Sequence, residues 1–168
     1  MKLSAYVKRF DDDINTDVII SGRYKFSITD MVELAKHIME DIRPDFYNEI
    51  KDKEAFIVAG KNFGCGSSRE QAPLALKAAG IKAVIASSFA RIFYRNSFNI
   101  GLPLIVCDTK EIKENDFLEI DMDEGVLKIK EFKEINFSIP LLMKEILEAG
   151  GGMEYFKKMT NFQMTNDE

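Results

Sequence analysis

Short apolar runs alternate with helical patterns through the middle of the chain. Residues 55–60 ("AFIVAG"), 83–88 ("AVIASS") and 102–106 ("LPLIV") are nearly continuous apolar segments, as expected for strands covered on both faces. The stretches between them, "PLALKAAG" and "FARIFYRNSFN", have the spacing of helices. Strands that alternate with helices at this spacing predict an α/β fold with a parallel sheet.

A strand and a helix are predicted before this region. Residues 3–8 alternate between apolar and polar positions, which indicates a half-buried strand. A helix is indicated from Asp30 onward, because Asp30 followed by Glu33 is typical of a helix start and apolar residues then recur on one face. The members of this apolar face are Met31, Leu34, Ala35 and Ile38. Pro44 closes the region.

The last third of the chain predicts a hairpin followed by helices. Residues 116–132 alternate tightly around Asp-Glu-Gly, which is typical of a hairpin turn. Pro140 opens a helix that ends in glycines, and "MEYFKKM" continues it as a short helix. The tail at 160–168 is expected to fray. Because there is no internal repeat and no linker, residues 1–168 are predicted to form a single domain.

Composition narrows the range of partners. The 168 residues are 46% hydrophobic and 30% charged, and the net charge of −5 with scattered basic residues argues against nucleic-acid binding. No apolar run approaches the roughly 18–20 residues that span a bilayer. The start "MKLSAYVKRFDDD" lacks the apolar core of a signal peptide. We therefore expect a cytoplasmic protein that binds neither nucleic acid nor membrane.

The rarest residue types exclude several kinds of catalytic site. Cys65 and Cys107 are too few for a disulfide framework or a four-thiolate metal site, which fits a reducing compartment. The single histidine, His37, excludes a multi-histidine metal site, and any Ser-His-Asp or Cys-His site would have to use it. Acid–base chemistry in this chain must therefore depend mostly on other residue types.

The segment "NFGCGSSREQA" (62–72) carries more polar chemistry than a turn requires. It leaves a predicted buried strand and enters a helix, so it lies at the carboxyl end of the sheet, where α/β proteins bind ligands. Gly64 and Gly66 allow close backbone approach, and a helix start near Glu70 presents unpaired N–H groups. Arg69 adds a guanidinium whose shape suits a carboxylate. With two adjacent serine hydroxyls, these groups predict an anion-binding loop.

Plainer interpretations of the same residues remain open. Ser67 and Ser68 each fit a capping box and could serve only as helix caps, and Arg69 could form only a surface ion pair. The segment has neither the Gly-Lys-Ser/Thr of a nucleotide-binding P-loop nor the Gly-x-Ser-x-Gly of a nucleophile elbow. Cys65 is interpreted as a passive thiol, because its sole candidate base is distant in sequence.

Three motifs, taken together, resemble the aconitase superfamily and, within it, the small subunits of isopropylmalate isomerases and homoaconitases. They are "NTDVIISG" (15–22), "GCGSSRE" (64–70) and "SFARIFYRN" (88–96), and the similarity extends over about residues 3–157. The resemblance implies a three-layer β/β/α swivelling domain that covers a [4Fe–4S] cluster on a separate large subunit, with no cofactor bound by this chain. It also implies a hydro-lyase of leucine biosynthesis that moves a hydroxyl between adjacent carbons of a malate derivative, by dehydration and rehydration.

The resemblance also assigns roles to residues of these motifs. Ser68 would be the catalytic base that removes the proton alpha to a carboxylate, and Ser67 and Arg69 would bind that carboxylate. Arg91 and Asp17 would lie near the substrate. The alternative for Arg91 is a position beside core-packing residues, and the alternative for Asp17 is an Asx turn. A serine alkoxide needs strong stabilisation by positive groups shielded from water, so the chain is expected to be active only with its partner.

The segment 23–30 ("RYKFSITD") is implied to contact the variable arm of the substrate. Candidate contacts within it are Tyr24, Lys25, Phe26 and Ser27. Phe26 favours isopropylmalate, because a phenyl face stabilises an isopropyl group and would leave a carboxylate unpaired. Homoaconitate and 2,3-dimethylmalate are the alternative substrates, and an inward-pointing Lys25 would favour a carboxylate.

Two other classes of function are compatible with the same loop. A stand-alone binding module would capture a small dicarboxylate at Ser67–Arg69 without catalysis. A purely structural partner would use the loop for neither purpose.

Overall fold

One mixed sheet forms the body of the protein. The computed structural model describes residues 1–24, 26–130 and 133–166, with side chains up to residue 161. Within these residues, seven strands form a single sheet in the order β4-β3-β2-β1-β5-β6-β7. The strands are β1 (Lys2–Arg9), β2 (Ala55–Ala59), β3 (Ile81–Ala86), β4 (Leu104–Val106), β5 (Phe117–Asp121), β6 (Val126–Ile129) and β7 (Lys133–Asn136).

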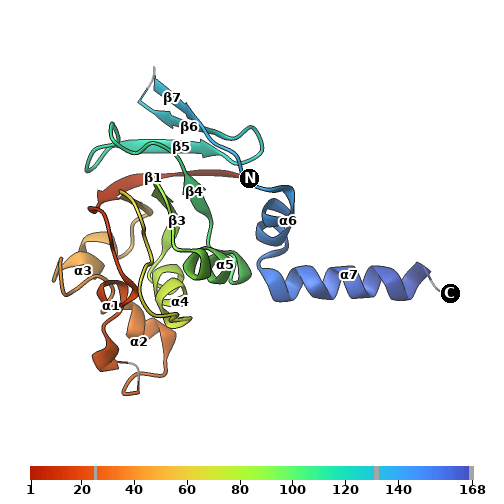
Figure 1. Cartoon of the computed structure of the whole chain (residues 1–168), viewed down its shortest axis with the longest axis horizontal. Helices are drawn as coiled ribbons and strands as arrows, with labels where there is room; N and C mark the ends of the chain where they lie inside the picture. Colours follow the sequence, from red (N-terminus) through yellow and green to blue (C-terminus); the bar gives the residue numbers. More distant parts are fainter. Residues whose placement is uncertain (25, 131–132, 167–168) are drawn as a thin grey trace.

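Helices connect the parallel strands and form the carboxyl-terminal part of the chain. In the described residues they are α1 (Thr16–Ile19), the 3-10 helix η1 (Gly22–Tyr24), α2 (Met31–Ala35), α3 (Phe46–Ile50), α4 (Gln71–Ala78), α5 (Arg91–Asn99), α6 (Leu141–Ala149) and α7 (Gly152–Asn166). Helices α6 and α7 lie at one end of the body, and α7 extends away from it (Figure 1).

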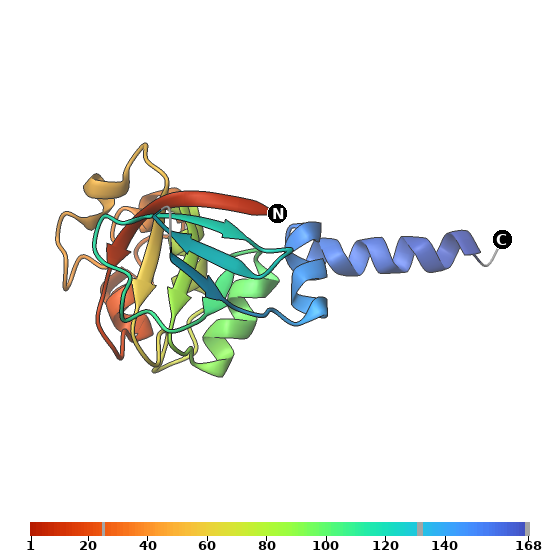
Figure 2. The same cartoon turned by 90° about the horizontal axis from the view of Figure 1, so that it is seen from above.

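The sheet has a parallel half and an antiparallel half that meet at β1. Strand β1 pairs in parallel with β2 and antiparallel with β5, so that Tyr6 lies between Ala55 and Phe117. The antiparallel strands β5–β7 curl over the parallel strands, while α1, α2, α4 and α5 lie on the opposite side (Figures 1 and 2). The sequence pattern predicted the α/β fold, and the resemblance to the aconitase superfamily implied the two β layers and one α layer.

Most of the predicted elements are present, close to their predicted positions. Strands β2, β3 and β4 and helices α4 and α5 occupy the central region, and α4 begins at Gln71, next to the predicted start near Glu70. Asp30 caps α2 as expected, because its carboxylate accepts hydrogen bonds from the N–H groups of Val32 and Glu33. Helix α2 ends at Ala35, however, earlier than the apolar pattern suggested.

Several short elements were not predicted. Helices α1 and α3 and strand β7 have only four or five residues each, too few for a clear periodic pattern. The carboxyl-terminal region also differs from the prediction. Helix α7 continues to Asn166, past Thr160, where the frayed tail was expected to begin.

The hydrophobic core lies on both faces of the parallel strands. Every residue of β2 is buried, and Phe56, Ile57 and Val58 have no exposed surface. Successive side chains of a strand point to opposite faces, so complete burial of β2 requires cover on both sides. Strand β2 is therefore fixed by packing on both faces, and so is the start of the loop that leaves its carboxyl end.

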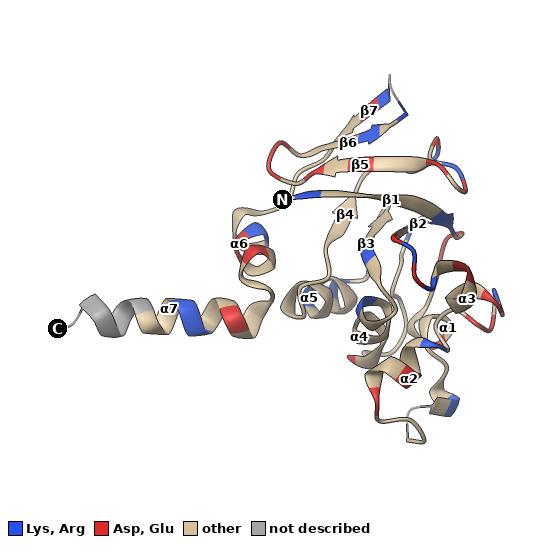
Figure 3. Cartoon of the chain, turned by 180° about the vertical axis from the view of Figure 1, so that it is seen from behind, with Lys and Arg blue, Asp and Glu red and all other residues tan. Residues whose placement is uncertain are grey.

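Charged residues lie around the periphery of this core. Figure 3 shows Lys and Arg segments interspersed with Asp and Glu segments, both around the helices and on the antiparallel strands. Among the described helices, none is long and apolar enough to cross a membrane.

A cluster of charged and aromatic side chains joins α3 to the segments that follow β1 and precede β5. The guanidinium of Arg43 donates to both oxygens of Glu49 at 2.8 and 2.5 Å and to Glu114 at 2.7 Å. It also lies 5.7 and 5.6 Å from the ring centroids of Phe10 and Phe46. The hydrogen bonds from Arg43 hold the pKa of Glu49 below its usual value.

The substitution Arg43→Met tests the contribution of this cluster. We expect the free energy of unfolding to fall by roughly 1.5–3 kcal/mol at pH 7, because partly buried, charge-assisted hydrogen bonds are lost while an apolar stem is kept. Since the pKa of Glu49 is lowered by folding, this difference should be complete above about pH 5. It should fade as the pH falls through the lowered pKa, because protonated Glu49 no longer pairs with Arg43.

Urea unfolding of both proteins between about pH 3 and pH 7 measures this difference. Lys128→Met is the control, because Lys128 forms an exposed pair with Glu134 and should change stability by less than about 0.5 kcal/mol. A loss in Arg43→Met that is the same at both ends of the pH range would contradict the prediction.

Candidate active site

The glycine–serine loop is bound on one side to the segment that precedes α1. The N–H of Gly64 donates to the carbonyl of Ile14 at 2.7 Å, and the N–H of Thr16 donates to the carbonyl of Cys65 at 2.9 Å. Asn15 and Cys65 accordingly form an isolated parallel β-bridge. The first two motifs of the sequence, 40 to 50 residues apart, therefore lie side by side.

On its other side, the loop is bound to the segment that precedes α5. The N–H of Phe63 donates to the carbonyl of Ser88, and the N–H of Ala90 donates to the carbonyl of Phe63, both at 3.0 Å. The hydroxyl of Ser88 also accepts a hydrogen bond from the N–H of Asn62 at 2.8 Å. All three motifs thus meet at the carboxyl ends of the parallel strands, where the strand–helix pattern predicted the loop 62–72.

Gly64 allows this close approach of the loop to α5. Its φ is +79°, and a Cβ added there would lie 2.2 Å from Cγ of Phe93. A side chain at this position would therefore be strained in its backbone and would overlap the aromatic ring. The ring of Phe93 is itself buried and packs edge-to-face on Phe63, with centroids 5.4 Å apart.

Neither serine of the loop caps the following helix. The N-cap of α4 is Glu70, in helical conformation, and its side chain makes no capping hydrogen bond. Ser67 and Ser68 are exposed, and neither hydroxyl has a hydrogen-bond partner among the described residues. The carbonyl of Ser67 accepts a hydrogen bond from Oγ1 of Thr16 at 2.7 Å. The chain is therefore held at residue 67, while the two hydroxyls stay available.

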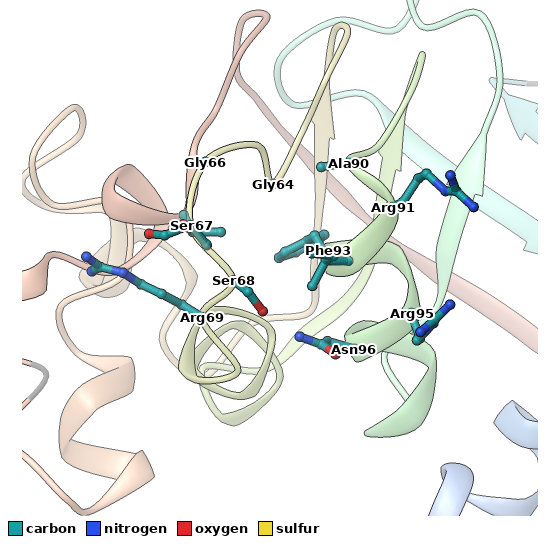
Figure 4. Close-up of a pocket in the computed structure, with 12 residues that line it drawn as sticks. Gly64, Gly66, Ser67, Ser68, Arg69, Ala90, Arg91, Phe93, Arg95 and Asn96 are labelled. Carbon is teal, nitrogen blue, oxygen red and sulfur yellow. The ribbon is translucent and has the colours of Figure 1, made fainter.

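A pocket of about 490 Å³ lies between this loop and α5. Figure 4 shows the hydroxyl of Ser68 pointing into the pocket, toward Phe93 and the side-chain amide of Asn96. The lining residues come from α1, the loop and the first turns of α5; they are Thr16, Gly64, Gly66, Ser67, Ser68, Arg69, Ala90, Arg91, Ile92, Phe93, Arg95 and Asn96. A reactive hydroxyl at Ser68 would therefore meet a ligand here.

The guanidinium of Arg69 points away from the hydroxyl of Ser68 (Figure 4). It pairs with the carboxylate of Asp17 and donates to the carbonyl of Ile20 at 3.2 Å. It also lies against Gly22, where an added Cβ would be 3.1 Å from one of its nitrogens. Arg69 thus joins the loop to the segment that leads into η1, and the expected convergence of Arg69 and Ser68 does not occur within this chain.

The structure brings Asp17 to the site and leaves Arg91 at its edge. Asp17 is in the first turn of α1, with its side chain 58% exposed beside Arg69, so it is more than an isolated Asx turn. Asn15, rather than Asp17, caps α1, because its side chain accepts a hydrogen bond from the N–H of Val18. Arg91 lines the pocket, but its guanidinium is directed outward from the Ser68 side (Figure 4).

The segment after η1 lies near Arg69, because Ile28 and Arg69 line the same small pocket. Phe26 is 90% exposed, and the hydroxyl of Ser27 donates to the carbonyl of Arg23 at 3.2 Å. The hydroxyl of Tyr24 donates to the carboxylate of Glu40. Lys25, the remaining candidate contact of this segment, lies outside the described residues.

Sequence reasoning did not select two residues that the pocket places near Ser68. Thr16 and Asn96 both line it, and the amide of Asn96 has no hydrogen-bond partner among the described side chains. Each stands at the edge of a motif that the sequence analysis quoted, in "NTD" and "YRN". Their positions in those motifs were the one feature of the sequence that could have indicated Thr16 and Asn96 as site residues.

The described residues include no group of three or more His, Cys, Asp or Glu side chains that could hold a metal ion. Both cysteines are free thiols, and burial raises the pKa of Cys107 to about 11. The functional groups of this surface are therefore hydroxyl, guanidinium, amide and carboxylate groups.

Comparison with known proteins finds one family. Residues 8–109 match the aconitase C-terminal domain. The 3-isopropylmalate dehydratase small subunit of Halothermothrix orenii is 52% identical over 162 residues, which cover 94% of this chain and 96% of that protein. The 3-isopropylmalate dehydratase small subunit 1 of Archaeoglobus fulgidus is 54% identical over 155 residues, which cover 90% of this chain and 94% of that protein.

A solved structure has the same fold throughout. The crystal structure of 3-isopropylmalate dehydratase from Methanocaldococcus jannaschii superposes with a TM-score of 0.92 at 48% sequence identity, and 99% of each chain is covered. The agreement therefore extends beyond the 8–109 region to the antiparallel strands and the last helices.

The substitution Gly64→Ala tests whether the close contact with Phe93 fixes the loop. We expect a loss of roughly 2–5 kcal/mol in the free energy of unfolding, because a positive φ and a steric overlap both oppose a side chain. Gly80→Ala is the matched control, since Gly80 has a φ of +90° but nothing within 4 Å of an added Cβ. It should lose only about 1–2 kcal/mol. Equal losses in thermal or urea unfolding would contradict the steric role.

Proposed function

This chain belongs to the aconitase C-terminal domain family, and on that basis we propose that it is the small subunit of a heteromeric hydro-lyase of leucine biosynthesis. The reaction interconverts 2-isopropylmalate and 3-isopropylmalate by dehydration and rehydration. Relatives named 3-isopropylmalate dehydratase small subunit, at about 50% identity over nearly the whole chain, support this assignment. We take residues 1–168 as one domain of this enzyme.

The availability of the Ser68 hydroxyl is the observation that carries the proposal. A serine at a helix start usually caps the helix, whereas here Glu70 occupies the N-cap and Ser68 faces a pocket. In the proposed reaction Ser68 removes a proton alpha to one carboxylate. The electron pair of that C–H bond forms the alkene as the hydroxyl leaves the neighbouring carbon, and addition of water in the opposite sense yields the isomer.

A serine base requires an environment that the free chain lacks. A hydroxyl is a very weak acid, so its alkoxide must be stabilised by positive groups in a site of low dielectric constant. Ser68 is exposed here, and the guanidinium of Arg69 is directed to Asp17. We therefore assign Arg69 and Ser67 to binding a substrate carboxylate, with Asp17 holding Arg69 in place. The base becomes effective only when a partner excludes water from this surface.

We assign the remaining catalytic groups to that partner, a large subunit. Described residues of this chain offer no cluster of metal ligands, and we place the [4Fe–4S] cluster of the enzyme on the large subunit. Bound there, the cluster would supply a Lewis acid for the departing hydroxyl. Two free thiols fit a reducing cytoplasm as the location of this chain.

The exposed segment around Phe26 is our candidate for contact with the variable arm of the substrate. A phenyl ring that is 90% exposed in the free chain can bury apolar surface against an isopropyl group. It offers nothing to a carboxylate, which would be left unpaired on desolvation. We therefore propose isopropylmalate as the substrate, with Ser27 in the same segment and Arg91 at the far edge of the pocket as secondary contacts.

Ser68→Ala tests the catalytic role. In a complex with the large subunit, we expect kcat to fall by roughly 10²–10⁴-fold, the usual contribution of a positioned base, with assembly unchanged. Ser4→Ala, at an exposed serine on β1, is the control and should keep full activity. Steady-state assays of both variants, with the chain alone as the inactive reference, measure this.

Three results, from these assays and from a binding measurement on the complex, would refute the proposal. Turnover by the chain alone would contradict the need for a partner. An unchanged kcat in Ser68→Ala would show that Ser68 is not the catalytic base. A wild-type complex that binds dicarboxylate without turnover would indicate a binding module instead of an enzyme.

Phe26→Arg tests the assignment of the substrate. We expect kcat/KM for 2-isopropylmalate to fall by roughly 5–100-fold, the effect of losing one apolar contact. The value of kcat/KM for homoaconitate should rise relative to that for 2-isopropylmalate. Phe156→Arg, at another exposed phenylalanine on α7, should leave both values unchanged. Competition assays with isopropylmalate, homoaconitate and 2,3-dimethylmalate give the ratios. A wild-type preference for homoaconitate or 2,3-dimethylmalate would overturn the assignment of isopropylmalate as the substrate.

A further inference from the structure

A cluster of polar and aromatic side chains lies beside η1, outside the Ser68 pocket. The ring of Tyr24 stacks on the imidazole of His37, with centroids 4.1 Å apart and an interplanar angle of 26°. The hydroxyl of Tyr24 donates to Oε1 of Glu40, and Nδ1 of His37 lies 2.9 Å from Oε2 of the same carboxylate. Both oxygens of Glu40 are therefore occupied, each by an aromatic side chain from a different segment.

Arg23 completes the cluster from the exposed side. Its guanidinium lies 3.3 Å from Oε1 of Glu40 and 2.7 Å from Asp41, and it sits over the ring of Tyr24 at 5.5 Å from the centroid. Two adjacent residues of η1 are thus bound to two adjacent carboxylates beyond α2. Such a set of contacts fixes both the direction and the rotation of η1.

Glu40 is suited to this role by its burial and its charge. Its side chain is only 23% exposed. Burial by itself would raise its pKa, but hydrogen bonds from Tyr24, His37 and Arg23 outweigh burial and lower the pKa. The carboxylate therefore stays ionised and accepts from all three groups at neutral pH.

The cluster lies directly before the exposed segment 26–30. At its far end, Asp30 is fixed as the N-cap of α2. Between these points Phe26 is almost fully exposed, the N–H of Ile28 donates to the carbonyl of Tyr24, and Ser27 donates to that of Arg23. The segment is thus folded back on η1, so its position depends on what holds η1.

We propose that Glu40 is a positioning residue for substrate selection: by holding Tyr24, Arg23 and His37, it fixes the segment 26–30 that meets the variable arm of the substrate. The proposal rests on the function proposed above and deepens it. Tyr24 then acts as an anchor rather than as a substrate contact, and the single histidine has a structural partner rather than a catalytic one. None of these side chains lines the pocket that Ser68 faces.

Glu40→Gln is the test, with Glu33→Gln as the matched control. Glutamine keeps the size of the side chain, but it removes the charge and leaves one acceptor oxygen for three donors. Glu33 lies within α2, and among the described residues its exposed carboxylate pairs with Lys36. Assembled with the large subunit, both variants are assayed with 2-isopropylmalate and with 2-methylmalate, which has a methyl group in place of the isopropyl arm.

We expect Glu40→Gln to lower kcat/KM for 2-isopropylmalate about tenfold, mainly through KM, and to change the value for 2-methylmalate less than twofold. Tyr24→Phe, which removes only the hydroxyl, should act in the same direction. Glu33→Gln should match wild type. An equal loss on both substrates, or no loss on either, overturns the positioning role.

Limited trypsin cleavage gives a second readout that needs no activity. Arg23 lies in the 3-10 helix η1, and trypsin binds its substrate as an extended chain, so cleavage after Arg23 requires η1 to open. Glu40→Gln should therefore be cleaved there about tenfold faster than wild type or Glu33→Gln. Unchanged cleavage overturns the proposal. Faster cleavage with a wild-type complex that turns over neither acid would instead refute the proposed function while leaving the anchor in place.

Discussion

Main-chain hydrogen bonds along residues 63–65 hold the candidate site together. This segment lies between residues 14–16 and 88–90 and bonds to both, so three motifs that are distant in sequence form one surface. Gly64 is required there, because its φ is positive and the ring of Phe93 leaves no room for a side chain. Hydrogen bonds fix the main chain as far as residue 67. They do not extend to the hydroxyl of Ser68, which is therefore exposed.

The polar groups of the loop face in two directions, and this division explains why a single chain is insufficient. Ser68 faces the pocket beside α5, whereas Arg69 reaches toward Asp17 on the other side of the loop. One small dicarboxylate can use both only if it bridges the loop or if a second surface encloses it. Enclosure also lowers the dielectric constant, which strengthens the effect of each fixed charge on a developing alkoxide. Division of the site between two subunits is the simplest arrangement that meets both needs.

Prediction from the sequence succeeded where a segment carries a clear apolar pattern, a cap or a turn signal, and failed for short segments that carry none of these. The central strands and α4 and α5 carry apolar patterns of five or more residues, and these patterns reflect burial directly. Helices α1 and α3 and strand β7 are stabilised by their tertiary contacts rather than by a pattern of their own. The contact between Tyr24 and Glu40 could not be predicted either, because the two residues are 16 positions apart and Glu40 lies in no segment that the sequence pattern singles out.

By itself, the sequence determined the α/β order of elements, the position of the polar loop at a strand end and the residue types available for chemistry. These features depend on backbone preferences and periodic burial, which are encoded within a few consecutive residues. Only the tertiary structure decided that Glu70 rather than a serine occupies the N-cap of α4, that Arg69 turns to Asp17, and that Tyr24 donates to Glu40. The direction of a side chain depends on partners that packing brings from distant parts of the chain, and no local pattern specifies those partners.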